Sequence, residues 1–319
     1  MSRLRARPYA PQDADAWDDV VGRAWNGSFL HTRRFISFAE SRFEETSLVI
    51  EEGGRVVGVF PAAVHPTDPT MVESHPAISY GGIVHDGSLG GASFLQALES
   101  VAERYYHDGA RSLRYKAMPG VYQRLPTADD LYALFRMAAI RSRCDLASVI
   151  DVLDRPPASR RRVRSLGKAR RAGVQVQRGS QHLEALWGVL TERLATKFGA
   201  EPLHTLPEMQ MLCSAFPEQI EFVVGVLSGR VVAGVVLFHT GQTDHFQYIA
   251  ADDRGYAASA LDMIIEECIE DARSGGRRYV SLGNSTLYGG RVLNETLHKF
   301  KSEFGAGSVV HEAYDLRLG

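Results

Sequence analysis

The sequence predicts a mixed α/β protein made of two similar halves, on the evidence of a repeated hairpin, a repeated helix-to-strand step and a proline-rich join. Residues 47–65 and residues 221–240 each hold two apolar runs around a glycine-bearing turn, which is the signal of a β-hairpin. The second strands open alike at residues 54–57 and 229–232. A hairpin-rich sheet whose later strands are joined by helices is a mixed α/β fold.

A second match follows each hairpin, and its start and its end are both repeated 166 residues later, since 258 − 92 and 275 − 109 are equal. Residues 92–95 open a helical pattern that ends at Gly109, and residues 258–261 open another that ends at Gly275. A strand pattern follows each glycine. Two matched segments at one spacing indicate an internal duplication. We therefore expect helices, a hairpin, a third strand, a helix and a fourth strand in each half, with third strands at residues 78–84 and 244–251.

The join between the halves is predicted near residues 153–159. The segment 154–158 contains two prolines, which exclude both regular helix and central strand. Ser159 then suits the N-cap of a helix that Gly173 can end. The sequence thus predicts an N-terminal domain over residues 1–153 and a C-terminal domain over residues 154–319.

Bulk properties suit a soluble protein without metal or disulfides. A length of 319 residues is comfortable for two domains, and a net charge of −2 creates no global field for DNA or an anionic membrane. The three cysteines show no paired spacing, which indicates a reducing compartment. No apolar run reaches the about 18 residues of a membrane span, and the first residues do not resemble a signal peptide. We expect a cytoplasmic protein with no metal and no membrane partner.

A basic run marks the start of the second half. Residues 155–171 hold eight Arg or Lys and no acidic residue. Arginines in a first helical turn oppose the helix dipole, so an anion nearby would relieve them. Arg161 and Arg164 are therefore candidates for binding a substrate phosphate, carried by coenzyme A, by a nucleotide sugar or by tRNA. A solvated helix face is the alternative.

The first half offers a candidate acceptor site. His75 is a candidate general base, because an unperturbed histidine titrates near neutral pH. Tyr80 could bond a sugar or nucleotide, and Gly81 and Gly82 allow close approach of the backbone. Lys116 closes the fourth strand and could bind phosphate. The alternatives are a tight turn with a satisfied histidine and a lysine that protects a sheet edge.

The second half offers further polar candidates. His204 lies in a proline-flanked loop and is the second candidate base. Gln247 and Tyr248 lie on the third strand, where an ordinary buried aromatic is the alternative. Asn284 and Ser285 follow the fourth strand, where polar groups face ligand crevices or cap a turn.

The order of elements, doubled, resembles the tandem GNAT arrangement of FemAB-like and related acyltransferases. Besides this order, five short strings carry the resemblance, which covers nearly the whole chain: residues 75–82, 116–126, 161–173, 202–206 and 300–305. The likeness is closest to sugar N-acyltransferases that modify a nucleotide-linked amino sugar with an acyl-CoA. FemAB-like enzymes, which use aminoacyl-tRNA, are the nearby alternative.

The resemblance implies a coenzyme A loop in the second half. The family places Arg or Gln, two residues, Gly, one residue and a small residue before a helix, and Arg254 to Ser259 occupies that place. Ala257 replaces the expected glycine, so the pattern is degenerate, and a plain strand-to-helix turn is the alternative. The implied cofactor residues are Arg254, Gly255, Ala258 and Ser259, with Asn284 and Ser285.

The resemblance also implies direct attack of a neutral amine on an acyl thioester. Backbone N–H groups near Tyr248 would hold the oxyanion, and Tyr248 would protonate the leaving thiolate. Lys301, in the pair with Phe300, would face the reacting acyl group. The first half would hold the acceptor through Tyr122 and the residues named above, with Gln247 also binding substrate, and the active site would lie in a cleft between the domains.

The expected function is therefore N-acyl transfer from acyl-CoA to a dTDP- or UDP-linked amino sugar. Two alternatives stay open: aminoacyl-tRNA-dependent amide formation, and a non-catalytic protein that binds a nucleotide sugar. Apolar helices could serve a homodimer or the domain interface.

Overall fold

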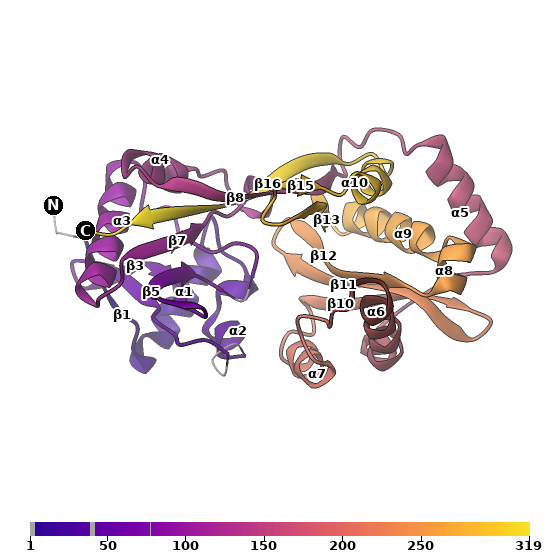
Figure 1. Ribbon diagram of the computed structural model, residues 1–319, viewed down its shortest axis with the longest axis horizontal. Helices are drawn as coiled ribbons and strands as arrows, with labels where there is room; N and C mark the ends of the chain where they lie inside the picture. The colour runs from indigo at the N-terminus through magenta and orange to yellow at the C-terminus, as the bar shows by residue number, and fades with distance from the viewer. Residues whose placement is uncertain (1–3, 39–41, 77) are drawn as a thin grey trace. The chain divides into compact units, whose positions relative to one another are not determined.

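The computed structural model describes residues 4–38, 42–76 and 78–319, and the chain divides into two compact units (Figure 1). Unit 1 comprises Met1–Leu146, Thr286–Val292 and Val310–Gly319, and unit 2 comprises Ala147–Ser285 and Leu293–Val309. Strands β8 (Ile140–Asp151) and β16 (Gly307–Arg317) continue across the boundary. By contacts, therefore, two late segments of the sequence belong with the first unit.

Unit 1 holds a small antiparallel sheet and part of a larger mixed one. The small sheet has the order β1-β2-β3-β6, and the larger one runs β4-β5-β7-β16-β8. Its strands are β1 (Arg5–Pro8), β2 (Leu48–Glu52), β3 (Arg55–Phe60), β4 (Ala62–His65), β5 (Asp68–Ser74), β6 (Val84–His85) and β7 (Ser112–Lys116). Its helices are α1 (Ala14–Arg23), α2 (Arg33–Ser37), α3 (Ala92–His107) and α4 (Asp129–Arg136), with short 3₁₀ turns at Pro11–Asp13, Phe29–His31 and Gly120–Tyr122.

Unit 2 is built on the strand order β8-β13-β12-β11-β10-β9. Its own strands are β9 (Gln175–Arg178), β10 (Ile220–Leu227), β11 (Arg230–Thr240), β12 (Thr243–Ala251) and β13 (Tyr279–Asn284). Its helices are α5 (Arg160–Ala172), α6 (Leu183–Phe198), α7 (Leu206–Ala215), α8 (Asp253–Ala258), α9 (Ala260–Ser274) and α10 (Glu295–Ser302), with a 3₁₀ turn at Ser180–His182. The short hairpin β14 (Thr286–Leu287) and β15 (Val292–Leu293) lies on the boundary between the units.

The structure confirms the predicted repeat of elements. The hairpin β2–β3 in unit 1 corresponds to β10–β11 in unit 2, and both are antiparallel. Each unit then joins two parallel strands through a long helix, β5–α3–β7 in unit 1 and β12–α9–β13 in unit 2. The helix α3 buries Phe94 and Leu98, and α9 buries Ile264 and Ile265, in the core of its own unit. Their amphipathic pattern thus follows from packing on a sheet.

One predicted element is wrong. The third strand of the first half is β5 rather than residues 78–84, where the structure has only the two-residue β6 (Val84–His85) at the end. The Lys116 ammonium donates hydrogen bonds to the carbonyls of His75 and Ile78, both at 2.7 Å. Because a side chain satisfies this backbone, the segment needs no strand partner there.

The helix α5 forms as predicted. Ser159 accepts a hydrogen bond from the Arg162 amide at the N-cap, and Gly173 ends the helix in the left-handed conformation with φ of 78°. Within the described part of the chain, no helix combines the length and the hydropathy needed to cross a bilayer.

Candidate functional site

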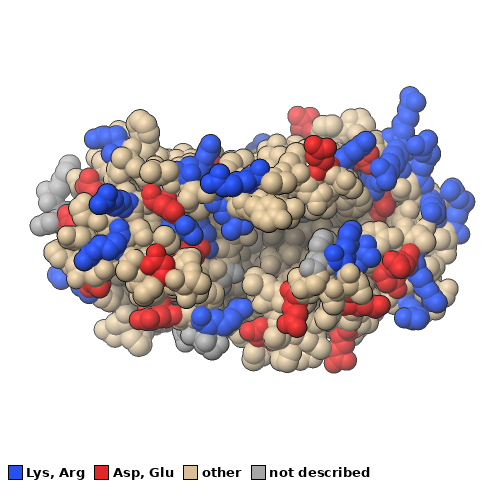
Figure 2. Space-filling view, viewed as in Figure 1, with Lys and Arg blue, Asp and Glu red and all other residues tan. Residues whose placement is uncertain are grey.

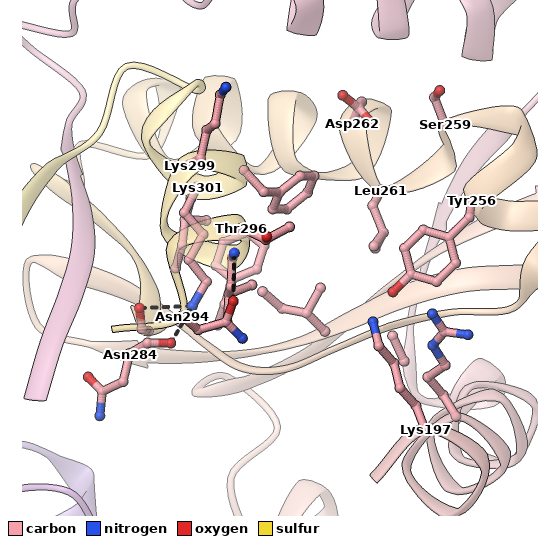
Figure 3. Close-up of a pocket in the computed structure, with 18 of the residues that line it drawn as sticks. Lys197, Tyr256, Ser259, Leu261, Asp262, Asn284, Asn294, Thr296, Lys299 and Lys301 are labelled. Atoms are coloured by element: carbon pink, nitrogen blue, oxygen red, sulfur yellow. Dashed lines mark hydrogen bonds between the residues drawn. The ribbon is translucent and has the colours of Figure 1, made fainter. Parts of the chain in front are cut away.

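A pocket of about 1000 Å³ opens inside unit 2, where two parallel strands separate (Figure 3). β12 and β13 pair at only three positions, the last of which joins His245 to Ser281. Beyond this point both strands line the pocket, β12 from Phe246 to Ala250 and β13 from Leu282 to Asn284. Strands that diverge leave a wedge into which a ligand's extended arm can enter.

A β-bulge lies at the mouth of this wedge. The register between β11 and β12 passes from Val236–Tyr248 to Leu237–Phe246 and leaves Gln247 without a partner on β11. Gln247 also lies beyond the last position paired with β13, and it lines the pocket. Bulges occur beside active sites because they release backbone groups from the ladder.

Lys301 is buried in the pocket wall opposite the bulge strand. Its ammonium donates to the carbonyls of Gly283 at 2.9 Å and Asn284 at 2.7 Å, which are drawn in Figure 3. These two bonds leave one of its three donors for a ligand. Burial lowers the pKa of Lys301 to about 8, so the side chain is mostly protonated at neutral pH and loses its charge in mild alkali.

The helix α10, which carries Lys301, is held by a buried arginine from α5. The Arg162 guanidinium lies 2.7 Å from Asp262 on α9 and 3.1 Å from Glu303 just after α10. It also stacks over the rings of Phe300 and Phe304, at 4.8 and 5.3 Å from their centroids. Burial raises the pKa of Asp262, and the charge of Arg162 opposes that rise.

The pocket walls are mainly basic. Five cationic side chains besides Arg162 line it, and Asp262 is the single carboxylate among the described lining residues. Figure 2 shows Lys and Arg gathered over α5, at the right of the view. The basic lining residues are Arg161 on α5, Arg193 and Lys197 on α6, and Lys299 and Lys301 on α10. Such walls favour an anionic ligand.

The predicted coenzyme A loop folds as helix α8 instead of an open cradle. Its N-cap Asp252 accepts the Gly255 amide at 2.7 Å, and the Tyr256 amide bonds the Asp252 carbonyl. Gly255 is buried, and a Cβ there would lie 2.3 Å from the Val232 carbonyl oxygen, so this glycine serves packing. Arg254 is exposed and does not line the pocket.

The other predicted cofactor residues divide between wall and interior. Ser259 and Asn284 line the pocket, whereas Ala258 and Ser285 are buried outside its lining. Arg164 is exposed on α5 and is not in the lining.

His204 and Tyr248 form one pair. His204 Nδ1 lies 2.7 Å from the Tyr248 hydroxyl, and the Tyr248 ring packs edge-on to Trp187 at 5.3 Å. Neither side chain is in the pocket lining, although Tyr248 is adjacent to the bulge residue Gln247. The structure therefore unites two residues to which the sequence analysis gave separate roles, behind the pocket wall.

His75 and Lys116 of unit 1 are engaged in internal contacts. Their Nε2 and Nζ atoms bond backbone carbonyls, that of Leu30 at 2.5 Å in the case of His75. Burial, followed by repulsion from His31, lowers the pKa of His75 well below its ordinary value. Lys116 also pairs with Glu73 at 3.1 Å, and burial lowers its pKa to about 8 despite that carboxylate. All three donors of Lys116 are thus occupied, which indicates a structural role.

The predicted acceptor turn in unit 1 is also closely packed. The rings of Tyr80 and Tyr122 are buried with centroids 4.9 Å apart. Gly82 has φ of 84°, and a Cβ there would lie 2.4 Å from the Tyr115 hydroxyl. A Cβ at Gly81 would approach His75 and Ser74 at 3.0 Å. These glycines allow aromatic packing within the unit.

The pocket thus gathers five of the predicted site residues: Arg161, Gln247, Ser259, Asn284 and Lys301. Sequence reasoning missed Arg193, Lys197 and Tyr256, although the four-residue spacing of the two basic residues on one helix was a usable signal. Within the described ranges, no three His, Cys, Asp or Glu side chains are grouped as a metal would require.

Comparison with known proteins identifies the kind of domain that carries this pocket. Residues 158–289 match the family model described as an acetyltransferase (GNAT) domain. No curated protein matches the chain.

Solved structures share the fold over nearly the whole chain. FemX is 13% identical with a TM-score of 0.70, over 98% of this chain and 97% of that one. The C-terminal domain of a putative lysylphosphatidylglycerol synthetase from Agrobacterium fabrum is 11% identical with a TM-score of 0.64, over 96% and 92%. A tandem GNAT protein from the clavulanic acid biosynthesis pathway is 13% identical with a TM-score of 0.52, over 99% of each chain.

At these identities the structures establish the fold alone. All but the last four residues of the family match, 286–289, fall in unit 2, and the match contains the separated strands, the bulge and most of the pocket wall. Residues 158–289 therefore form a GNAT domain, and together with the fold they support an N-acyltransferase enzyme.

Proposed function

We propose that this protein transfers an acyl group from acyl-CoA to an amine, with the acyl donor bound in the unit 2 pocket. The observation that carries the proposal is the separation of β12 from β13 beyond the His245–Ser281 pair, with Gln247 and Lys301 at the opening. This wedge suits the narrow arm of a thioester, and a pocket of about 1000 Å³ lies at the large end of small-molecule sites.

The bulge and Lys301 suit the charge that develops during the reaction. The neutral amine attacks the thioester carbonyl carbon, a C–N bond forms, and the carbonyl oxygen becomes an oxyanion. The backbone at Gln247 and the remaining donor of Lys301 stabilise that charge. The intermediate then expels the thiolate as the C–S bond breaks.

Lys301 also suits the proton balance of this step. Its lowered pKa, about 8, is close to that of a thiol, so its ammonium can protonate the thiolate and then recover the proton released by the attacking amine. The products are an amide and free coenzyme A. His204 and Tyr248 are assigned a positioning role in this proposal, because their hydrogen bond supports the strand at the bulge from the side away from the pocket lining.

For the acceptor we propose a nucleotide-linked amino sugar, as the sequence resemblance implies. The chemical requirement from the mechanism is a primary amine that is neutral when it attacks. The residues of unit 1 that the sequence suggested for the acceptor have a structural role in this proposal, because they are buried in contacts within that unit. They are His75, Tyr80, Gly81, Gly82, Lys116 and Tyr122.

The test is an acyl-transfer assay with purified protein, acetyl-CoA and a panel of dTDP- and UDP-amino sugars. Thiol release is followed by absorbance, and the amide product by its mass. Lys301→Met should lose turnover while Arg230→Met, at an exposed hairpin position outside the pocket, should retain it. If the Lys301→Met variant keeps the turnover of the wild type, the proposed chemistry is refuted.

Aminoacyl transfer from tRNA is the second candidate function, and the exposed basic face of α5 favours it. This face continues from Arg161 in the pocket wall to residues 170–171 at the far end of the helix. A row of cations is the usual contact for a nucleic-acid backbone. A neighbour in fold is titled a putative lysylphosphatidylglycerol synthetase, a name that describes transfer of an aminoacyl group.

The same assay with charged tRNA in place of acetyl-CoA separates the two functions. Amide formation from charged tRNA alone, with a steep decrease as salt rises, would favour the second candidate. Amide formation from acetyl-CoA, with weak salt dependence, would favour the first.

A further inference from the structure

Helix α5 carries a row of cations on its exposed side. The helix packs chiefly against α9 and α8, and the side chains that it buries are Arg162 and Ala169. Because these two residues are separated by two helical turns, they mark one face of the helix. Four exposed cations, one at each turn, form the basic stripe of α5 on the opposite face: Arg160, Arg164, Lys168 and Arg171. Figure 2 shows the resulting concentration of Lys and Arg over α5.

The described residues supply no ion-pair partner to the basic stripe. Within the described ranges, the ion pairs of α5 are formed by Arg161 and Arg162, with Glu303 and Asp262, and the stripe residues form none. The first turn of α5 contains no acidic residue, so its arginines oppose the helix dipole. Like charges one turn apart also destabilise a helix. The folded chain therefore maintains an unfavourable arrangement of charge that an external polyanion would relieve.

The composition around the stripe favours a lipid surface over RNA. Proteins that bind RNA combine cations with aromatic side chains on which bases stack, and residues 152–174 contain no Phe, Tyr, Trp or His. Val163, one turn from Arg160, is 61% exposed, and an aliphatic side chain gains from a lipid interface. From Arg160 to Arg171 the helix rises by about 17 Å, at about 1.5 Å per residue. A flat array of phosphates can therefore meet all four cations.

We propose that the basic stripe docks this protein on the surface of an anionic lipid bilayer. The guanidinium and ammonium groups bind the phosphates of the headgroups, and Val163 contacts the interface. The opposite face of α5 is buried against α9 and α8, so the helix rests on the bilayer and does not insert into it. Attachment is therefore electrostatic and reversible, and salt weakens it.

The net charge of the whole chain, −2, predicts no membrane partner, but a bilayer responds to local charge. The field of an anionic leaflet decays within a Debye length, about 8 Å at physiological salt. Over such a distance the segment 155–171, with eight cations and no carboxylate, determines the attraction.

The basic stripe is separate from the pocket in unit 2. The residues that α5 contributes to the pocket lining are Arg161, Arg162 and Ser165, and none of them belongs to the stripe. Docking through the stripe therefore leaves the pocket wall in place. For the same reason this inference does not depend on the acyl transfer proposed above.

Co-sedimentation of the full chain with lipid vesicles tests the docking surface. Vesicles of phosphatidylcholine with about one-third phosphatidylglycerol supply the anionic surface, and pure phosphatidylcholine vesicles are the neutral reference. The triple variant Arg164→Gln/Lys168→Gln/Arg171→Gln should bind the anionic vesicles roughly a hundredfold more weakly than the wild type, because three cations near the surface are lost. Binding of the wild type should also disappear at about 1 M salt, where charges are screened within about 3 Å.

A matched control removes the same charge from exposed positions outside α5. The variant Arg55→Gln/Arg230→Gln/Arg317→Gln does so, and it should bind anionic vesicles nearly as tightly as the wild type. Glutamine and arginine have similar helix propensities, so circular dichroism should show an intact fold in both triple variants. Since the stripe opposes its own helix, the α5 variant should melt at or above the melting temperature of the wild type.

Four results would overturn the proposal. Equal affinity of the wild type and the α5 variant for anionic vesicles would exclude the stripe. An equal loss of affinity in the matched control would show that net charge alone is responsible. Equal binding of the wild type to neutral vesicles would exclude an electrostatic attachment. If transfer RNA at an equal concentration of phosphate fully displaces the wild type from anionic vesicles, the surface belongs to a nucleic acid instead.

Discussion

Arg162 Nη1 lies 2.7 Å from Asp262 Oδ1, and this buried contact joins α5 to α9 in the wall of the pocket. The same guanidinium reaches Glu303 beyond α10, so one side chain links three helices. Lys301 lies on the helix that this contact restrains.

Replacing Arg162 should therefore destabilise unit 2. Arg162→Met leaves the carboxylates of Asp262 and Glu303 without their buried cation, which should cost about 3–5 kcal/mol of unfolding free energy. Denaturant titration measures the loss. Arg161→Met is the control, because its side chain is 65% exposed and lies 3.9 Å from Glu303, and it should cost less than about 1 kcal/mol. Equal losses of unfolding free energy in the two variants would contradict a stabilising role for the buried contacts of Arg162.

Lys301→Met should reduce turnover and raise stability together. Turnover should fall by about 10²–10³ because one donor to the developing charge is removed. Burial lowers the pKa of Lys301, so the folded state is penalised while the lysine is charged, and stability at pH 7 should rise by about 1 kcal/mol or more.

The pH dependence provides a second check on Lys301. The penalty is complete below pH 8 and is relieved between pH 8 and the ordinary pKa of 10.5. Wild type and variant should therefore converge in stability over this interval, while wild-type turnover declines above pH 8. A constant stability difference up to pH 10 would show that the lysine keeps an ordinary pKa.

His239 should give unit 2 a stability that is lost in alkali. Burial alone would lower its pKa, but hydrogen bonds to Asp244 and Glu221 outweigh burial and raise the pKa to about 9. The stabilisation is complete below the unfolded pKa of about 6.5 and disappears as pH rises through 9. Melting temperatures from pH 6 to 10 should fall in the wild type toward those of His239→Gln. If the melting temperatures of the wild type and of His239→Gln differ by a constant amount from pH 6 to 10, the contacts of His239 with Asp244 and Glu221 are not the source of the pH dependence.

Gly82→Ala should destabilise unit 1 without any ligand being involved. The new Cβ would lie 2.4 Å from the Tyr115 hydroxyl in a left-handed backbone, so a loss of about 2–4 kcal/mol is expected. Gly54→Ala is a useful control, since φ is also positive, at 82°, but no atom lies within 4 Å of its Cβ. Gly54→Ala should lose only the free energy needed to hold alanine in the left-handed backbone conformation, about 1 kcal/mol. Thermal unfolding without substrate distinguishes the two.

Tyr248→Phe should separate packing from catalysis. The ring keeps its contact with Trp187, while the hydrogen bond to His204 is lost, at a cost of about 1–2 kcal/mol. Because the hydroxyl is outside the pocket lining, we expect turnover to fall by less than about tenfold. A loss of a thousandfold at unchanged KM would instead assign the hydroxyl to the chemistry.

The fold was largely predictable because its signals are local. Ser159 and Gly173 mark the ends of α5 by capping chemistry, and the glycine-bearing turns mark both hairpins. Residues 78–84 were misread as a strand because their backbone bonds Lys116, a residue distant in sequence. Local pattern contains no information about such a partner.

The site was less predictable because burial decides which polar residues remain available. His75 and Lys301 look equally reactive in sequence, yet one is enclosed by the rings of unit 1 and the other lines a pocket. Arg254 fits a family pattern, but Asp252 caps the segment into a helix and leaves Arg254 outside the pocket lining. The pair of His204 and Tyr248 joins positions 44 residues apart, which spacing alone cannot reveal.

The assignment of Val310–Gly319 to unit 1 has a consequence for how the chain folds during synthesis. Ala313 to Arg317 of β16 pair with β7, and Asp315 forms an ion pair with Arg114 at 2.8 Å. A ribosome releases these residues only after all of unit 2 has been translated. The unit that is made first is therefore completed last, and its sheet keeps an open edge beside β7 until β16 arrives. During that interval the nascent chain exposes an unpaired strand, which is where chaperone capture and aggregation begin.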